Sequence, residues 1–451
     1  MTIDTALISR IQFAFTISFH ILFPAFSIGM VTFLTVMEGM YLKTGKLLYR
    51  NICKFWTKVF ALTFGMGIVS GIVMEFQFGT NWNEFTYAVG GVLGSLFTYE
   101  VLTAFFIEAG FLGVMLFGWE KVGPKLHYLA TCLVFIGVTF SAFWILAANS
   151  WMQTPDGVSF TNGQFQVTSW IHVILNHSTV IRYLHMILAA WITTGFVILG
   201  ICAYYLKNKL HLEFSQKCFS FILGALIILV PLQGYIGDTV GLEVHRDQPI
   251  KTAAMEGVWN TTKGAPLLLF AIPDQKQARN YWELKIPYGA SLLNTHKLDG
   301  ELVGLTSVPP QDRPFVIFPF YGFRIMVGMG LIMLAVVLVG LILWLRKRLF
   351  DTKWFLNLCM LTTPIGFIAL WFGWITAETG RQPWIVYNFI RTMDAASHVN
   401  LLHVIVSFAL IVIVYGIMFG YFYFKYLLKL LKAGPTLEPE KQDQPFQYLG
   451  G

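Results

Sequence analysis

Apolar residues occupy most of this chain in long blocks that short polar segments separate. Nine blocks are long enough to cross a bilayer as helices, which takes roughly 20 residues each. They lie near residues 11–39, 55–79, 91–118, 126–150, 178–206, 216–238, 316–345, 355–379 and 398–428. Because the bilayer core offers no water to backbone groups, apolar blocks of this length are expected to be helical. The pattern predicts an all-α integral membrane protein with about nine transmembrane helices.

One polar segment is much longer than the others and lies between the sixth and seventh blocks. We therefore divide the chain into residues 1–239 with helices one to six, a loop at 240–315, helices seven to nine at 316–430, and a tail at 431–451. Long loops without structure of their own are uncommon in compact proteins, so a functional role is expected for this one.

Composition and charge support a membrane protein and give it an orientation. Hydrophobic residues make up 56% of the chain and charged residues only 12%, against about 25% charged in a typical soluble domain. The basic residues gather in alternate short connections, among them Lys43, Lys46, Arg50, Lys54, Lys121, Lys125, Lys207, Lys209, Arg346, Lys347 and Arg348. The positive-inside rule then places the N-terminus and the long loop outside and the C-terminus in the cytoplasm. The net charge of +7 is assigned to this orientation, and no nucleic-acid partner is expected.

The N-terminus and the cysteines predict neither a signal peptide nor a cysteine-based site. The first residues carry charges and show no cleavage pattern, so no removable signal peptide is predicted. The five cysteines are scattered without a CxxC pair, which argues against a thiolate cluster or a disulfide framework.

Four side chains with ligand chemistry fall in the predicted outer half of the membrane. They are His20, His185, Met326 and Glu378. An ionisable side chain at the bilayer centre costs about 2.5–3.5 kcal/mol on insertion scales, so each one needs an explanation. Imidazole, thioether and carboxylate can all serve as axial ligands of haem. The alternative for each is structural, because lone histidines are often merely hydrogen-bonded and Met326 is one of sixteen methionines.

Two further carboxylates occur in the third predicted helix. Glu100 and Glu108 are eight residues apart, which in an α-helix separates them by about 80° around the axis and roughly 12 Å along it. Carboxylates that step inward from a redox site suggest a proton relay. A pair of structural carboxylates bonded to neighbouring helices remains the alternative.

Several segments resemble one membrane-protein family in sequence and in order. They are SRIQFAFTISFHILF, YEVLTAFFIEAGFLG, ANSWMQTP, RYLHMILAAW, QPIKTAAMEG, FRIMVG and GRQPW. With them, nearly the whole chain resembles subunit I of the cytochrome bd family of quinol:oxygen oxidoreductases, including its cyanide-insensitive branch.

The resemblance implies a role for each candidate residue. It implies that His185 and Met326 ligate a low-spin haem b. His20 and Glu378 would ligate two high-spin haems, one a haem b and the other a haem d or a further haem b, without settling which residue serves which. Residues around the haems would be Arg10, Asn149, Arg324, Trp374, Arg381 and Gln382. Lys251 and Glu256 would serve quinol oxidation, and Glu100 and Glu108 the proton pathway.

The implied function is that of a terminal oxidase in a bacterial cytoplasmic membrane. Quinol would be oxidised at the outer face and O₂ reduced to water with cytoplasmic protons, which generates a proton motive force. The expected partners are a second subunit, to which some members add a small single-helix subunit. A haem-copper oxidase is disfavoured because the chain has no adjacent histidine pair. A secondary transporter with carboxylates near the midplane is the alternative from another class.

Overall fold

The computed structural model describes residues 4–436 and is mainly helical. Within these residues, nine helical segments are long and apolar enough to cross a membrane. They are Thr5–Thr44, Leu47–Thr80, Asn83–Phe117, Pro124–Gln153, Trp170–Lys207, Leu212–Asp247, Pro310–Leu345, Lys353–Thr379 and Leu401–Ala433. The predicted fold class and the nine predicted spans are thereby confirmed. Most of the predicted tail lies outside the described residues.

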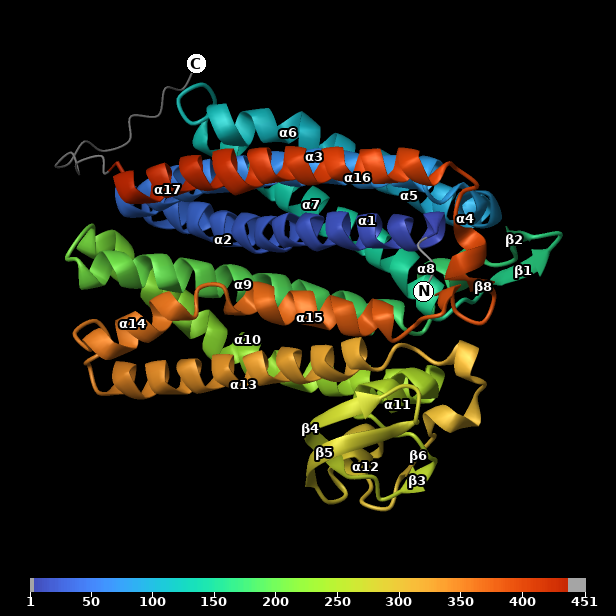
Figure 1. Ribbon diagram of the computed structural model, residues 1–451. Helices are drawn as coiled ribbons and strands as arrows, with labels where there is room; N and C mark the ends of the chain where they lie inside the picture. The colour runs from blue at the N-terminus through green and yellow to red at the C-terminus, as the bar shows by residue number, and fades with distance from the viewer. Residues whose placement is uncertain (1–3, 437–451) are drawn as a thin grey trace.

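The spans run roughly parallel and form two connected groups (Figure 1). One group contains α1 (Thr5–His20), α2 (Leu22–Thr44), α3 (Leu47–Thr80), α7 (Pro124–Gln153) and α16 (Leu401–Tyr415). The other contains α9 (Thr179–Lys207), α10 (Leu212–Asp247), α13 (Ile317–Leu345), α14 (Lys353–Leu361) and α15 (Ile365–Thr379). Helix α2 packs against α9 and joins the two groups.

Helix α9 lies at the centre of the bundle because small residues let its neighbours approach closely. A Cβ added at Gly29 of α2 would lie 2.2 Å from Thr194 Oγ1, and one at Gly366 of α15 would lie 2.5 Å from Thr193 Cα. Close contact of this kind is how membrane helices gain packing energy without a hydrophobic driving force between them. His185 therefore sits on a helix that is held from two sides.

The third span is not α-helical throughout. It consists of α4 (Asn83–Val89), the π-helical Gly90–Gly94, α5 (Ser95–Glu100), the π-helical Val101–Phe105 and α6 (Phe106–Phe117). A third π-helical stretch, Gly416–Tyr423, lies in the last span, between α16 and α17 (Phe424–Ala433). Because π-helix contains more residues per turn, the 80° expected between Glu100 and Glu108 does not hold.

The long loop is a small folded unit at one end of the bundle (Figure 1). It contains α11 (Pro249–Glu256), α12 (Gly289–Thr295), and the antiparallel pairs β4–β5 (Leu267–Asp274 with Arg279–Ile286) and β3–β6 (Thr262–Lys263 with Glu301–Leu302). Helix α10 continues to Asp247, beyond the predicted end of the apolar block at 238, so the boundary drawn at 239 falls inside a helix. Hydropathy marks where a helix leaves apolar surroundings and says nothing about where it stops.

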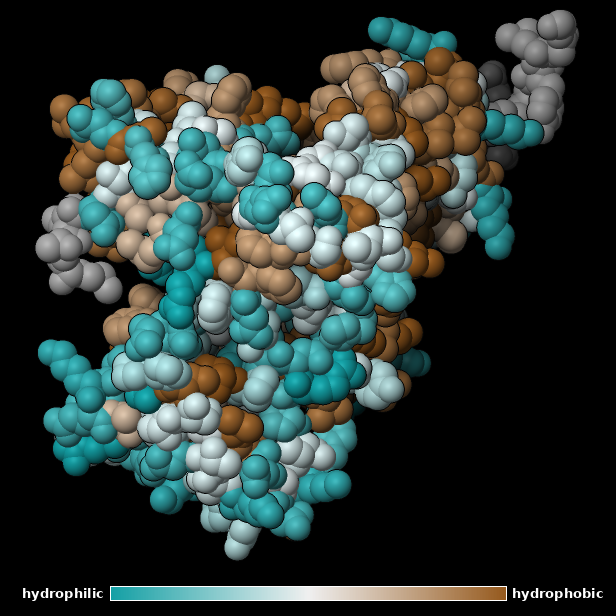
Figure 2. Space-filling model, turned by 90° about the vertical axis from the view of Figure 1, so that its right-hand side faces the viewer, coloured by the Kyte–Doolittle hydropathy of each residue, from teal (hydrophilic) through white to brown (hydrophobic). Residues whose placement is uncertain are grey.

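Two more hairpins lie at the same end of the bundle. They are β1–β2 (Val158–Thr161 with Gln164–Val167) and β7–β8 (Trp384–Val386 with Ile390–Arg391), beside the short α8 (Trp170–Ile174). Figure 2 views the molecule from this end, where hydrophilic side chains cover most of the loop unit and apolar ones appear on the flank of the helices. The bundle therefore has one polar cap and apolar sides.

Candidate functional site

His185 and Met326 lie on helices that face each other across the second group. Helices α10 and α15 each pack against both α9, which carries His185, and α13, which carries Met326. A Cβ added at Gly237 of α10 would lie 3.3 Å from His185 Cε1, and one at Gly373 of α15 would lie 2.8 Å from Met326 Sδ. Each candidate ligand is thus seated on a glycine of an intervening helix.

The side chain of Gln233 of α10 lies beside the His185 ring. The Gln233 amide nitrogen lies 3.3 Å from Nδ1 and 3.4 Å from Nε2 of the ring, and it donates to the His185 carbonyl at 3.2 Å. The amide oxygen of Gln233 is buried without a partner. Gln233 was not among the residues singled out from the sequence.

His20 at the end of α1 is oriented by Ser70 of α3. Ser70 Oγ donates to the carbonyl of Gly67 at 2.9 Å, so it accepts from His20 Nδ1 at 3.0 Å. That assignment leaves Nε2 with the lone pair, which is the form of imidazole that binds a metal. A Cβ at Gly71 would lie 3.2 Å from the ring. The ring is therefore held in a form suited to ligation.

Glu378 lies in the centre of a charged network at the end of α15. Its Oε1 accepts from Asn149 at 3.0 Å and from Gln153 at 3.2 Å, and its Oε2 pairs with Arg381 at 2.5 Å. Arg182 of α9 donates to the Asn149 side-chain oxygen. Arg381 is only 5% exposed, so these contacts form in a region shielded from water.

The same network has guanidinium nitrogens that nothing in the described part of the protein satisfies. Arg182 Nε and both Nε and Nη1 of Arg381 are buried without hydrogen-bond partners. Buried donors without an acceptor are rare and costly. Anionic oxygens of a bound group, such as the propionates of haem, would satisfy them, so the residues present fit a haem.

The other residues assigned to the haem surroundings differ in their contacts. Arg10 Nη2 donates to Gln382 Oε1 at 3.2 Å, which also accepts from Thr392 at 2.9 Å. Trp374 is half-buried one turn before Glu378 and packs against the main core.

Arg324 lies beneath the loop unit, where it holds the unit to the membrane helices. Its Nε donates to the Leu268 carbonyl and its Nη1 to the Met255 carbonyl, both at 2.6 Å. Its guanidinium also stacks over the Phe320 ring at 3.5 Å.

Lys251 and Glu256 of α11 are both buried but have different partners. Lys251 is 3% exposed, and its Nζ donates to Gln153 Oε1 at 3.0 Å and to Gln248 Oε1 at 2.9 Å. Burial lowers the pKa of the Lys251 amine well below its usual range.

Glu256 points toward α12 and Arg324. It is 0% exposed, its Oε1 accepts from Asn294 at 3.0 Å, and its Oε2 has no hydrogen bond and lies 3.7 Å from Arg324 Nη2. Burial raises the pKa of the Glu256 carboxyl above its usual range, against Arg324 and Asn294, which lower it. A carboxyl with a raised pKa and one oxygen that makes no hydrogen bond is suited to accept a proton.

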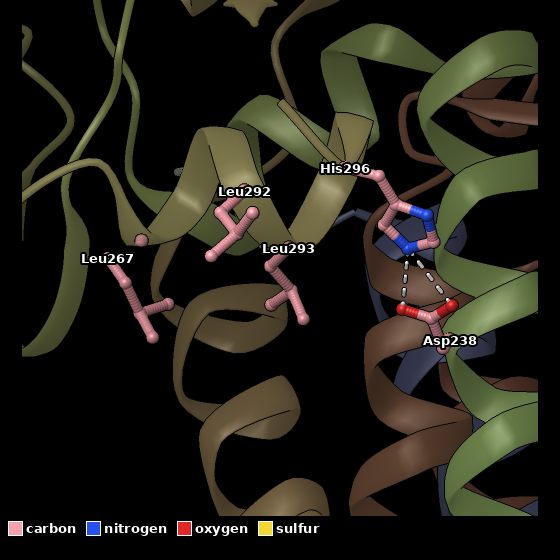
Figure 3. Close-up of a pocket in the computed structure, with 6 residues that line it drawn as sticks. Asp238, Leu267, Leu292, Leu293 and His296 are labelled. Atoms are coloured by element: carbon pink, nitrogen blue, oxygen red, sulfur yellow. Dashed lines mark hydrogen bonds and ion pairs between the residues drawn. The ribbon is translucent and has the colours of Figure 1, made fainter. Parts of the chain in front are cut away.

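Two cavities flank this part of the loop. The first measures about 430 Å³ and is lined by Asp238, Leu267, Gly289, Leu292, Leu293 and His296. Figure 3 shows its apolar wall of leucines and, opposite, His296 bonded to Asp238 at 3.1 and 3.2 Å. The second measures about 290 Å³, and Glu256, Trp259, Asn280 and Arg279 are among the residues lining it. Helix α12 lines the first cavity with its leucines and contacts Glu256 through Asn294.

Glu100 and Glu108 both face α7. Ser141 Oγ donates to Glu100 Oε1 at 2.7 Å, and a Cβ added at Gly137 would lie 2.7 Å from Glu108 Cγ. Positions 137 and 141 are one turn apart, so the two carboxylates meet α7 at neighbouring levels. Glu108 is 7% exposed, and no hydrogen bond to its side chain appears among the described contacts.

The chain matches known proteins over nearly its whole length. The sequence profile of cytochrome bd terminal oxidase subunit I matches residues 8–435. The chain belongs to the cytochrome bd subunit I family.

Individual relatives agree with that assignment. Cytochrome bd-II ubiquinol oxidase subunit 1 of Escherichia coli (strain K12) is 32% identical over 99% of this chain and 100% of its own. Cytochrome bd ubiquinol oxidase subunit 1 of Bacillus subtilis (strain 168) is 35% identical over 94% of this chain and 93% of its own. Among solved structures, the bd oxidase from Geobacillus thermodenitrificans matches with a TM-score of 0.88 at 27% identity, covering 96% of this chain and 99% of that one.

Membership of the cytochrome bd family confirms several expectations at once. The protein is a multi-pass membrane oxidoreductase of the electron-transport class, a quinol oxidase subunit, and haem cofactors and a quinol substrate follow from the family. The transporter alternative is thereby set aside. Cytochrome bd oxidases generally work with a second subunit.

Like Gln233, Arg182 and Gln153 of the candidate site were not singled out from the sequence. Arg182 precedes His185 by three positions, and Gln153 follows Asn149 by four. Both spacings place a side chain on the same helix face as a residue that had been singled out. Both residues could have been found in the segments RYLHM and ANSWMQ by looking for polar side chains three or four positions from each candidate.

Proposed function

We propose that this chain is the haem-bearing subunit of an oxidase that oxidises quinol at the outer face and reduces O₂ to water with cytoplasmic protons. The observation that carries the proposal is the gathering of Glu378 with unsatisfied Arg182 and Arg381, together with imidazole and thioether donors on neighbouring helices. In this proposal His185 and Met326 ligate a low-spin haem b. His20 and Glu378 ligate the two high-spin haems, of which one is a haem b and the other a haem d or a further haem b.

Haem, when bound, supplies the one-electron redox chemistry that joins quinol oxidation to O₂ reduction. The residues of this chain orient it and balance its charge. Arg182 and Arg381 offer three unpaired guanidinium nitrogens to carboxylates, and charge-assisted bonds of this kind are about twice as strong as neutral ones. Arg10, Asn149 and Gln382 fix the neighbouring side chains.

Quinol oxidation is assigned to the loop unit. Glu256 accepts a proton from quinol at Oε2, which makes no hydrogen bond within the described protein, while Asn294 holds Oε1 and Arg324 lies 3.7 Å from Oε2. The leucine-lined cavity suits the apolar tail of a quinol, and the polar cavity beside Glu256 suits the departure of the proton to water. Lys251 assists quinol oxidation from the other side of α11, where its ammonium bonds to Gln153 of the Glu378 network.

Protons for water formation are assigned to Glu108 and Glu100. In the orientation that the basic residues favour, Glu108 lies nearer the cytoplasm. Ser141 donates a hydrogen bond to Glu100, which lies nearer the outer face. Quinol protons released outside and water protons taken from inside would charge a bacterial cytoplasmic membrane. A second subunit is assigned to the apolar flank of the bundle, which also admits a small single-helix subunit.

A reduced-minus-oxidised absorption spectrum of the purified membrane protein tests the proposal. We expect bands of low-spin and high-spin haem together with quinol-dependent oxygen consumption, and haem extraction with mass identification gives the number and type. A preparation with native folding and no haem bands would contradict it.

A further inference from the structure

A buried hydrogen-bonded chain connects the loop unit to the carboxylate at the end of α15. Lys251 Nζ donates to Gln153 Oε1 at 3.0 Å, and Gln153 Nε2 donates to Glu378 Oε1 at 3.2 Å. Gln153 is 1% exposed, so water does not compete for either bond. One side-chain amide therefore spans the distance between a loop ammonium and a candidate haem ligand.

The amide is oriented by its neighbours. Its oxygen accepts from Lys251 and also from Gln248 Nε2 at 3.1 Å, while its nitrogen donates to Glu378 and to the Ala377 carbonyl at 3.4 Å. A flipped amide would set its nitrogen against the Lys251 ammonium and its oxygen against the Glu378 carboxylate. The network thus has one favourable direction, from cation through amide to anion.

Lys251 is also packed so that it cannot easily turn away. A Cβ added at Gly380, two residues after Glu378, would lie 2.7 Å from Lys251 Cγ and 3.2 Å from its Cε. The aliphatic stem of Lys251 therefore lies against the backbone that follows α15, with its ammonium directed at Gln153.

We propose that Gln153 is a positioning residue that couples the loop helix α11 to Glu378, so that Lys251 acts on the haem held by Glu378 through this amide. The positive charge of Lys251 polarises the amide and strengthens its N–H donation to Glu378, since linked hydrogen bonds reinforce one another. The inference rests on the proposed function in taking Glu378 as a haem ligand. It gives Lys251 a role on the haem side of the loop in addition to any contact with quinol.

A double-mutant cycle tests the coupling, with the midpoint potential of the high-spin haems measured by redox titration without quinol. The titration is run at a pH acidic enough to protonate the Lys251 amine, whose pKa is lowered by burial. Under that condition Lys251→Met removes a positive charge. Loss of this charge favours ferric haem, so the midpoint potential should fall. In a Gln153→Met background the same change should produce a clearly smaller shift, because the amide that carries the effect is gone. An equal shift in both backgrounds, or no shift in either, would overturn the proposal.

Two controls separate coupling from general disturbance. Gln233→Met makes the same substitution beside His185 and should alter the low-spin haem while leaving the high-spin potential unchanged. Gln248→Met removes a partner of both Lys251 and Gln153 but leaves the bonds from Lys251 through Gln153 to Glu378. The effect of Lys251→Met on the potential should therefore persist in its presence.

A second readout does not depend on bound haem. Hydrogen exchange of the α11 amides should rise in Gln153→Met and stay near the wild-type rate in Gln153→Glu, which keeps an acceptor for Lys251 but loses the donor to Glu378. Gln153→Glu should still lower the midpoint potential of the high-spin haems, because it replaces the donor to Glu378 with a second carboxylate. Unchanged exchange in Gln153→Met would contradict the link to α11. A protein without haem would refute the proposed function and leave the exchange result to decide the link.

Discussion

At the scale of single residues, the site depends on which direction a buried charged side chain faces. Lys251 and Glu256 are five residues apart on α11, which separates them by about 140° around the helix axis. Lys251 consequently reaches Gln153, and Glu256 reaches Asn294. Two residues that a sequence motif presents together therefore serve opposite sides of one short helix.

The proton-accepting role of Glu256 predicts a pH effect. Only the deprotonated carboxylate accepts a proton, and burial raises the pKa of Glu256, so kcat/KM for quinol should rise with pH over an acidic limb above the usual carboxyl range. Asn294 lowers that pKa by donating to the carboxylate, so Asn294→Leu should move the limb to higher pH. The pH profile of quinol oxidation checks this.

Two further variants, Glu256→Gln and a change at a control carboxylate of the loop unit, test the role of Glu256 in quinol oxidation. Glu256→Gln keeps the shape and removes the base, so the rate should fall by roughly 100-fold or more with the haem spectra intact. Glu301→Gln, which changes an exposed loop carboxylate that lines neither cavity, should leave the limb in place. An unchanged limb in Asn294→Leu would refute the assignment.

The proposed iron ligands predict selective loss of one haem signal. His185→Ala and Met326→Leu should each remove the low-spin haem spectrum and retain the high-spin one. Met→Leu nearly conserves volume, with a packing cost below about 1.5 kcal/mol, so a folded protein should remain. Absorption spectra of the purified variants measure this, and a normal low-spin spectrum in both would exclude them as ligands.

At the scale of helices, glycines determine where the candidate ligands can sit. The π-helical segment Val101–Phe105 has a similar effect in the third span, because it changes the angle at which Glu100 and Glu108 face α7. Gly237 lies under the His185 ring and Gly373 under the Met326 sulfur. The helices thus supply the shape of the site through positions that have no side chain.

Gly373→Ala should therefore displace Met326 without unfolding the protein. The new Cβ would lie 2.8 Å from Sδ, and the flexible thioether would move before the backbone does. We expect weakened low-spin ligation in the absorption spectrum. Gly330→Ala on α13 is the matched control, because nothing lies within 4 Å of its added Cβ and helix propensity favours alanine by about 1 kcal/mol. Equal spectra for the two variants would contradict this account.

At the scale of the whole molecule, function requires two faces and a route between them. The loop unit caps one end of the bundle (Figure 1), while Glu108 lies within the spans and faces α7. In the proposed function, quinol protons leave at the capped end and the protons for water formation arrive from the opposite end. Charge separation thus depends on the arrangement of the entire bundle.

Glu108→Leu should slow turnover strongly and leave the haems bound, since Glu108 contacts no proposed iron ligand. Oxygen consumption and membrane potential in proteoliposomes measure the effect. Glu213→Leu, at the first turn of α10, is a carboxylate control that should behave like the wild type. Full activity with intact potential in Glu108→Leu would remove it from the route, and loss of all haem would indicate a structural role instead.

The sequence by itself determined the membrane class, the nine spans and the family. These follow from local properties, because an apolar block long enough to span a bilayer has no other stable conformation there, and the family motifs are contiguous. It also marked His20, His185 and Glu378, because a polar side chain stands out in an apolar block, and Met326, because it lies in the family segment FRIMVG.

Only the tertiary structure decided which polar groups meet. Gln153 links Lys251 to Glu378, Arg182 joins the Glu378 network, and the π-helical turns change how Glu100 and Glu108 face α7. Hydrogen bonds between helices depend on helix rotation and on distances of a few tenths of an ångström. Hydropathy contains neither quantity, so these contacts become visible only when the helices are packed together.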